Sequence, residues 1–220
     1  MIDLPDLNQE FTWENNFYLS CQPARVGKLL AHYELFKMVA AVPGALVECG
    51  VFKGASLARF ACFRQLLEGS APREIVAFDI FGTFPATAFE ADQAQLQKFI
   101  SAAGDQSIAV DQMLEVLRRK HCDAGVDLVR GNVCETVPEY VRRRPDLKIS
   151  LLNLDTDVYE PAVVILEELY PRIEPGGVLV LDDYGVFPGE TKAVDDYFKG
   201  KDVEIRRLPF GSTPCFIVKS

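Results

Sequence analysis

The stretch LLNLDTDVYEP, residues 151–161, joins an apolar run to two aspartates, Asp155 and Asp157. A short apolar run that ends in acidic residues predicts a buried strand that stops at the edge of a sheet. A second stretch, GGVLVLDDYG at 176–185, repeats the pattern with Asp182 and Asp183. Asp155 and Asp182 lie 27 residues apart, which is the length of one strand-helix-strand unit. Two neighbouring parallel strands would therefore present their carboxylates side by side.

The rest of the chain beyond residue 44 alternates short apolar runs with segments of helical period, which predicts an α/β fold of the doubly wound, Rossmann-like kind. We expect a mostly parallel sheet of seven strands that ends in an antiparallel hairpin, with helical segments between the strands. The expected strands are 45–50, 74–79, 126–131, 148–155, 177–183, 203–208 and 214–219. The clearest helices are 55–68, 160–172 and 190–200.

Length and composition fit one domain, because 220 residues with 49% hydrophobic content can build a single core. Two parts of residues 1–220 lie outside the alternation. Residues 1–42 form an N-terminal helical segment, in which 22–41 has clear helical periodicity. Residues 83–122 form a helical insertion that could close over a site as a lid or simply add a packing layer.

The formal net charge of −9 argues against nucleic acid as a partner, because no basic field would attract phosphates. Six cysteines without a C-x-x-C pair indicate reduced thiols. The acidic N-terminus and the lack of a long apolar run indicate a cytoplasmic protein without a membrane partner. The apolar residues of 22–41 would suit an interface between copies as well as a core, so a homo-oligomer is also an expectation.

The turn VECGVFKGAS, residues 47–56, is a candidate cofactor site. Gly50 and Gly54 bracket a tight turn, and the helix that begins near Ser56 would point its positive end at a ligand. Any such turn can also carry glycine for steric reasons. Asp79 ends the next strand, where a carboxylate can accept hydrogen bonds from both ribose hydroxyls. Together these residues predict a site for a nucleoside-type cofactor.

The acidic strand ends predict a metal site. Asp155, Asp182 and Asp183 would repel one another unless a cation neutralised them, and hard oxygen ligands suit Mg²⁺, or alternatively Mn²⁺ or Ca²⁺. The alternative is that Asp182 and Asp183 merely cap a loop. Asp157 would face the same way as Asp155 if the chain stayed extended, which makes it the best candidate for a general base. His32 could compete only if its helix crosses the site.

With these residues placed, the chain resembles the class I S-adenosylmethionine-dependent methyltransferases and, within them, the macrocin O-methyltransferase family, which modifies sugars of antibiotics and related glycosides. The resemblance covers residues 43–200, and several motifs in the family's order make it specific. These motifs are PGALVECGVFKGAS, FDIFGTFP, GNVCETVPEY, LDTDVYEP and GGVLVLDDYGVFPGETKAVDDYF. The family usually carries a serine after the ribose aspartate, where this chain has Ile80.

The resemblance implies a role for each matching residue. The residues it assigns to S-adenosylmethionine are Glu48, Gly50, Gly54 and Ser56 around the methionine, Asp79 and Phe81 near the ribose, Asn132 and Val133 along the adenine, and Asp155. The residues it assigns to Mg²⁺ are Asp155, Asp182 and Asp183. Asp157 would remove the proton of a sugar hydroxyl, whose oxygen would then attack the sulfonium methyl in line. The implied partner is a small hydroxylated acceptor, either a glycoside or a nucleotide sugar.

Three other functions compete with this one. The segment VAFDIFGTF, residues 76–84, looks like the nucleophile motif of haloacid-dehalogenase-like hydrolases, which would make Asp79 a covalent nucleophile. That strand is normally the first in those enzymes, however, and their lysine motif is not evident here. A nucleoside-binding module without chemistry would not need a complete acidic cluster. A methyltransferase for a catechol-like or other vicinal-diol acceptor would have the same site.

Overall fold

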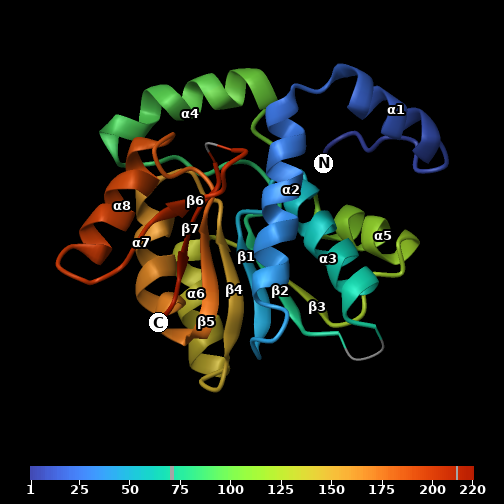
Figure 1. Ribbon diagram of the computed structural model, residues 1–220. Coiled ribbons are helices and arrows are strands. Elements are labelled where there is room, and N and C mark those ends of the chain that lie inside the picture. Colours follow the sequence, from blue (N-terminus) through green and yellow to red (C-terminus); the bar gives the residue numbers. More distant parts are fainter. Residues whose placement is uncertain (70–71, 212) are drawn as a thin grey trace.

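The computed structural model describes residues 1–69, 72–211 and 213–220 and shows a seven-stranded sheet between two layers of helices (Figure 1). The strand order is β3-β2-β1-β4-β5-β7-β6, with the first five strands parallel and β7 antiparallel to both β5 and β6. The strands are β1 (Ala45–Cys49), β2 (Ile75–Asp79), β3 (Val126–Arg130), β4 (Ile149–Leu154), β5 (Ile173–Leu181), β6 (Arg206–Arg207) and β7 (Cys215–Val218).

The helices divide between the two faces of the sheet because neighbouring strand residues point to opposite sides. Leu46 and Val178 pack on the layer of α2 (Pro23–Met38), α3 (Ala55–Leu67) and α5 (Val110–Arg119). Val47 and Leu179 pack on the layer of α6 (Val133–Arg143), α7 (Tyr159–Glu168) and α8 (Pro188–Phe198). These central strands are buried on both faces, as their continuous apolar sequence predicts.

The structure confirms the doubly wound fold and moves the start of two strands by three residues or more. Strand β5 begins at Ile173 instead of residue 177, because Ile173 pairs with Ile149 before a register shift in β4. Strand β6 is only two residues long, whereas a strand at 203–208 was expected. Val203 and Ile205 instead pack against the core on the α7 and α8 side, so the terminal hairpin pairs over a shorter length.

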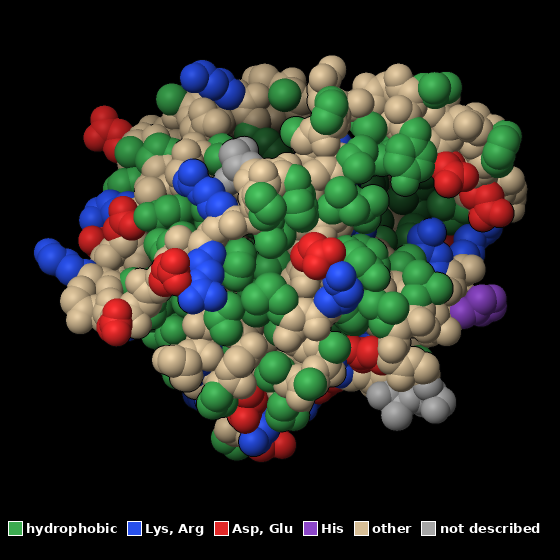
Figure 2. Space-filling view, viewed as in Figure 1, with side chains coloured by type: hydrophobic (Ala, Val, Ile, Leu, Met, Phe, Trp, Pro, Cys, Tyr) green, Lys and Arg blue, Asp and Glu red, His purple; other side chains and the backbone are tan. Residues whose placement is uncertain are grey.

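The N-terminal segment contains α2, as expected, and also α1 (Glu10–Ser20), which no clear periodicity in the sequence indicates. Helix α1 buries none of its residues, and Phe11 and Leu19 are 75% and 86% exposed. Figure 2 shows hydrophobic side chains along this rim, at the upper right. Within the described residues, every helix falls short of the length and apolar character that a membrane crossing requires.

The carboxyl edge of the sheet brings the predicted acidic strand ends together. Leu154 pairs with both Cys49 and Leu181, so the next residue of each strand follows in line. The Asp155 N–H donates to Cys49 O at 2.9 Å, and the Asp182 N–H donates to Leu154 O at 3.0 Å. Gly50 has φ +95°, and a Cβ there would lie 1.7 Å from the Asp155 carbonyl oxygen. Only glycine fits this crossing of β1 and β4.

The two halves of the 83–122 insertion lie differently. Helix α5 packs beside α3 and buries Met113 and Leu117 in the core, which is the packing layer that the sequence allowed for. Helix α4 (Glu90–Ala103) lies beyond the carboxyl ends of the strands, across the top of Figure 1. Within the insertion, α5 therefore belongs to the core, and α4 covers the carboxyl ends of the strands.

Asp92 attaches α4 to the helices on the other side of the sheet edge. Its buried carboxylate accepts from the Gly189 N–H at 2.7 Å and from the Tyr159 N–H at 3.0 Å, at the first turns of α8 and α7. A Cβ on Gly189 would lie 1.9 Å from this carboxylate, so glycine permits the close approach. Glu160 of α7 accepts in return from the Ala88 and Phe89 N–H groups. Asp92 of the insertion thus accepts from backbone N–H groups at the starts of α7 and α8, and Glu160 of α7 accepts from backbone N–H groups of the insertion.

Candidate active site

A cavity of about 580 Å³ opens at the carboxyl edge of the sheet, beneath α4 and beside α2. Its volume is in the range of small-molecule sites. The predicted site residues that line it are Gly50, Ser56, Asp79, Asn132, Val133, Asp155, Asp157, Asp182 and Asp183. Glu48, Gly54 and Phe81 lie outside its lining. The side chain of Phe81 is buried in the core on the α2 and α3 side.

Asp79 is tied to the glycine turn by its carboxylate. One oxygen accepts from the N–H groups of Val51 and Phe52 at 2.8 and 3.0 Å, and the other accepts from the Phe81 N–H at 2.6 Å. A carboxylate has about four acceptor positions, so one remains for a ligand hydroxyl in this arrangement. These contacts give no support to a free nucleophile at Asp79, because the side chain is already held by three donors.

Glu48 lies under the floor of the cavity. The Asn153 side chain donates to one of its oxygens at 3.1 Å, while the other oxygen has no hydrogen-bond partner in the described structure. Burial raises the pKa of Glu48 to about 7, against the opposing effect of the nearby Ser56 hydroxyl and of the hydrogen bond from Asn153. The hydrogen bond from Asn153 therefore joins β1 to β4 beneath the site.

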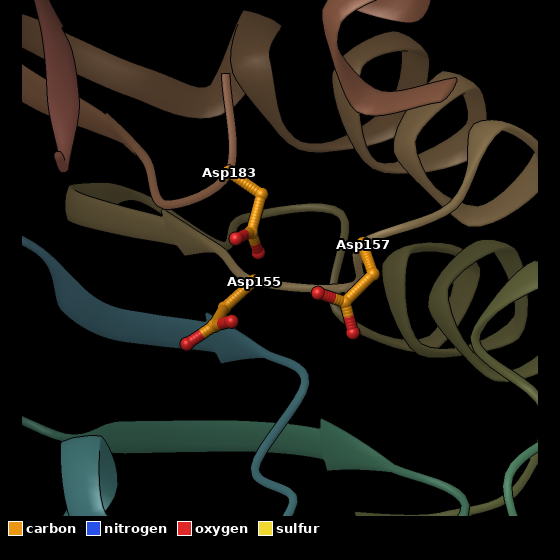
Figure 3. Close-up of side chains that lie close together, drawn as sticks. All are labelled: Asp155, Asp157 and Asp183. Atoms are coloured by element: carbon orange, nitrogen blue, oxygen red, sulfur yellow. The ribbon is translucent and has the colours of Figure 1, made fainter. Parts of the chain in front are cut away.

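Three carboxyl groups meet at the other end of the cavity. Figure 3 shows Asp155 and Asp157, from the loop after β4, and Asp183, from the loop after β5, turned toward a common space. One oxygen of each lies within 4.8 Å of the others. The chain does not stay extended between Asp155 and Asp157, because Asp157 has φ +64°. This left-handed conformation, which aspartate tolerates better than most residues, is what brings Asp157 into the cluster.

The cluster is electrostatically strained in the absence of a cation. Burial raises the pKa of Asp155 and of Asp183 well above the usual range, and the neighbouring carboxylates add to both shifts. Burial, followed by the charge of Asp155, raises the pKa of Asp157 to about 7. Either a shared proton or a positive ion must compensate such a group. The oxygen donor set and the spacing fit a hard divalent cation such as Mg²⁺.

Asp182 points away from this cluster and toward α2. Lys28 donates a hydrogen bond to its Oδ2, and His32 Nε2 lies 3.8 Å from its Oδ1, beyond hydrogen-bond distance. Burial opposes ionisation of Asp182, but the nearby His32 and the Lys28 charge together lower its pKa to about 2. The structure thus groups Asp157, rather than Asp182, with Asp155 and Asp183. Helix α2 lies beside the site, which is the condition under which His32 could compete with Asp157 as a general base. His32 is nearest to Asp182 within the site.

Several cavity residues had no signal in the sequence motifs. Behind the cavity wall, the Asp183 N–H donates at 3.0 Å to buried Glu190, which lies in the first turn of α8 and within the motif GGVLVLDDYGVFPGETKAVDDYF. Arg25 and Lys28 approach from α2 and Arg59 from α3. The spacing of Arg25, Lys28 and His32 by three and four residues would have shown that they share one helix face, although not that this face adjoins the acids.

The adenine-side residues also have a structural role. Asn132 caps α6, because its side-chain oxygen accepts from the Cys134 N–H at 3.0 Å. Its neighbour Val133 is buried and still lines the cavity. The N-terminus of α6 is therefore fixed at the cavity wall.

The sheet is doubly wound and ends in an antiparallel strand. A glycine turn follows β1, one acid ends β2, and further acids follow β4 and β5. These features are those of the Rossmann-like fold of the methyltransferases. Residues 24–207 match the model of the macrocin O-methyltransferase (TylF) family. This match covers most of the chain, so the chain belongs to that family.

Curated relatives agree with this assignment. The chain is 29% identical over 159 residues to a Streptomyces olivaceus enzyme named 8-demethyl-8-(2,3-dimethoxy-alpha-L-rhamnosyl)-tetracenomycin-C 4'-O-methyltransferase. It is 30% identical over 165 residues to demethyldecarbamoylnovobiocin O-methyltransferase of Streptomyces niveus. Each match covers 71% of this chain and 58% of the relative. The chain thus spans less than two thirds of the length of these relatives.

Solved structures show the same fold. CalS11, a calicheamicin methyltransferase, superposes with a TM-score of 0.79 at 28% identity, covering 98% of this chain and 87% of CalS11. The O-methyltransferase NovP gives a TM-score of 0.74 at 22% identity, covering 88% of this chain and 79% of NovP. The latter likeness concerns the fold alone.

Proposed function

We propose that this protein is an S-adenosylmethionine- and Mg²⁺-dependent O-methyltransferase that acts on a hydroxyl of a sugar or glycoside. The observation that carries the proposal is the meeting of Asp155, Asp157 and Asp183 in the same cavity as the glycine turn and Asp79, in a chain of this family. The relatives named above are O-methyltransferases of glycosylated antibiotics, which supports this acceptor class.

The cofactor would lie along the wall formed by β1, β2 and the start of α6. In this proposal Asp79 accepts a ribose hydroxyl, Asn132 and Val133 border the adenine, and Gly50 and Ser56 border the methionine. Glu48, Gly54 and Phe81 lie behind that wall and act by holding its shape. S-adenosylmethionine supplies the methyl group that is transferred.

We propose Asp155 and Asp183 as the core of the Mg²⁺ site. Mg²⁺ bound there would offset the repulsion among the carboxylates and lower the pKa of an acceptor hydroxyl. Asp182 belongs to the predicted ligand set, but Lys28 holds its carboxylate. We expect Asp182 to contribute only if Lys28 releases it. The variant Lys28→Met should then bind Mg²⁺ more tightly than the wild type, whereas an unchanged affinity would remove Asp182 from the ligand set.

Asp157 is the proposed general base. Burial raises its pKa in the metal-free protein, and Mg²⁺ bound beside it would lower that pKa again, so the assignment rests on the position of Asp157 rather than on its pKa. Its left-handed backbone holds the carboxylate beside Asp155 and Asp183, where it would meet the acceptor hydroxyl. The side chain is buried, so the proton would pass to Asp157 rather than to bulk water.

Helix α4 would cover the acceptor. It carries Phe99 into the cavity lining and is held across the sheet edge by Asp92. Cover by α4 would exclude water from the site during transfer. Acceptors of the catechol type remain the second candidate, because any vicinal diol could approach the same three carboxylates.

A methyl-transfer assay tests the proposal. The chain is incubated with S-adenosylmethionine and a panel of glycosides, nucleotide sugars and catechols, with Mg²⁺ or with a chelator, and S-adenosylhomocysteine is measured. We expect turnover only with Mg²⁺, loss of turnover with retained cofactor binding in Asp157→Asn, and wild-type behaviour in the exposed control Asp202→Asn. Turnover in the chelator, or full activity of Asp157→Asn, would contradict the assigned roles.

A further inference from the structure

Two arginines line the cavity without a direct hydrogen-bond or ion-pair partner among the described residues. Arg25 of α2 and Arg59 of α3 both line it, and neither guanidinium makes a hydrogen bond or ion pair with any described residue. The other two basic side chains of the cavity are engaged, since Lys28 binds Asp182 and Lys53 donates to the Ala103 carbonyl. Arg25 is exposed and Arg59 is half-buried, so both guanidinium groups lie at the open part of the cavity, where each can bind an anion.

The two guanidinium groups lie close enough to repel each other. Burial lowers the pKa of Arg59 from its ordinary value, and the charge of Arg25 lowers it further. The charges of Asp182, Glu48 and Asp155 oppose this shift and offset part of the repulsion, and a ligand that brings negative charge between the two arginines would offset the rest. A cationic pair in a cavity is also unusual for a chain of net charge −9. The arrangement therefore favours an anionic ligand over a neutral one.

The pair is next to the acidic cluster. Arg25 lies three residues before Lys28 on one face of α2, and Lys28 reaches Asp182. Arg59 also lines a second hollow, under α1, together with the aromatic side chains of Phe11, Phe17 and Tyr18. Figure 2 shows the surface hollowed below the rim that α1 forms. Arg59 thus lies between the cavity that contains the carboxylates and a second hollow that is lined by aromatic rings.

We propose that the acceptor is a sugar joined to a nucleoside diphosphate, with its diphosphate held by Arg25 and Arg59. This inference rests on the proposed methyltransferase function and names its substrate class. The sugar hydroxyls would lie at Asp155, Asp157 and Asp183, and the base would stack on the aromatic side chains under α1. Arg25 and Arg59 are then the residues that set acceptor specificity.

The charge count favours a diphosphate over a carboxylate. Two cations are matched by a group with at least two negative charges, and guanidinium groups bind phosphate oxygens in pairs. The carboxylate of the cofactor has another positive partner, because Ala55 and Ser56 at the N-terminus of α3 line the cavity as well. The arginines are therefore available to the acceptor.

Calorimetric titration of the whole chain in metal-free buffer tests this assignment. The probes are inorganic pyrophosphate, thymidine diphosphate and glucuronate, each with and without saturating S-adenosylhomocysteine. The variants are Arg25→Met and Arg59→Met. The controls are Lys53→Met, which removes an engaged cation of the same cavity, and Arg142→Met, which removes an exposed arginine of α6.

We expect pyrophosphate to bind the wild type, thymidine diphosphate to bind more tightly, and each arginine variant to weaken both by about tenfold or more. The controls should stay within about twofold of the wild type. Equal weakening by Lys53→Met, glucuronate binding as tight as pyrophosphate, or displacement of pyrophosphate by S-adenosylhomocysteine would each overturn the proposal. If the wild type binds S-adenosylhomocysteine but no pyrophosphate, this inference alone fails. If it binds no S-adenosylhomocysteine, the proposed function itself fails.

Discussion

Replacing Asp92 by alanine should destabilise the protein and free α4. The carboxylate is fully buried and accepts two backbone hydrogen bonds, at 2.7 Å from Gly189 and 3.0 Å from Tyr159. Asp92→Ala leaves two donors at helix N-termini unsatisfied, and each buried unsatisfied group costs about 1–3 kcal/mol. Partial access of water to these helix ends lowers the sum, so we expect a loss of about 2–4 kcal/mol. For a chain of this size that corresponds to a fall in Tm of roughly 5–15 °C.

The direction of the stability change in Asp92→Ala distinguishes the loss of hydrogen bonds from the relief of charge repulsion. The chain carries a net charge of −9, so removing one negative charge would by itself relieve repulsion. A loss of stability must then come from the hydrogen bonds. Calorimetric melting of Asp92→Ala beside Asp105→Ala, which removes an exposed carboxylate from the same insertion, measures the difference. If both variants melt within about 2 °C of the wild type, Asp92 does not hold α4 across the sheet edge.

The remaining predictions concern the floor and the acids of the site. Gly50→Ala should cost more than about 2 kcal/mol in urea unfolding, because φ is +95° and the new Cβ would meet the Asp155 carbonyl; wild-type stability would contradict the crossing of β1 and β4. Because the folded-state pKa of Glu48 is raised from 4.5 to about 7, its contribution to stability is fully present below pH 4.5 and is lost as pH rises through 7. Between pH 5 and 8 the free energy of unfolding should fall by roughly 3 kcal/mol less in Glu48→Gln than in the wild type. An unchanged pH profile would argue against a raised pKa of Glu48. Mg²⁺ at about 100 times its Kd should raise Tm by roughly 5–10 °C in the wild type and not in Asp183→Asn; an equal rise in both would place the ion elsewhere.

The sequence was sufficient to predict the sheet and to place the acidic strand ends of the candidate site at one edge of it. Apolar runs and helical periods are local signals, and the 27-residue spacing from Asp155 to Asp182 follows directly from one strand-helix-strand unit. The register that places both residues at one edge, through the pairs of Leu154 with Cys49 and Leu181, confirms this prediction of the topology.

Side-chain direction within the site could not be predicted in the same way. Extended geometry was the reason to place Asp157 beside Asp155, yet the structure brings them together through a left-handed turn at Asp157. Lys28, which turns Asp182 away, is 154 residues distant from it in the chain. Such pairings depend on how α2 packs against the sheet, which no local pattern specifies.

The same reason explains the missed residues of α4 and α1. Asp92 is an ordinary acid in the first turn of a helix until α7 and α8 present their N-termini to it. Helix α1 has no buried face, so it has no apolar period that a sequence pattern could reveal. The positions of α4 and α1 therefore depend on contacts between segments that are distant in the chain.

Calorimetric titration with S-adenosylhomocysteine, with and without Mg²⁺, tests the central claim most directly. We expect one cofactor site per chain, which weakens by about tenfold or more in Asp79→Ala, and a separate Mg²⁺ signal that is lost in Asp183→Asn. The absence of any S-adenosylhomocysteine binding to the wild type, in either buffer, would contradict the proposed methyltransferase function.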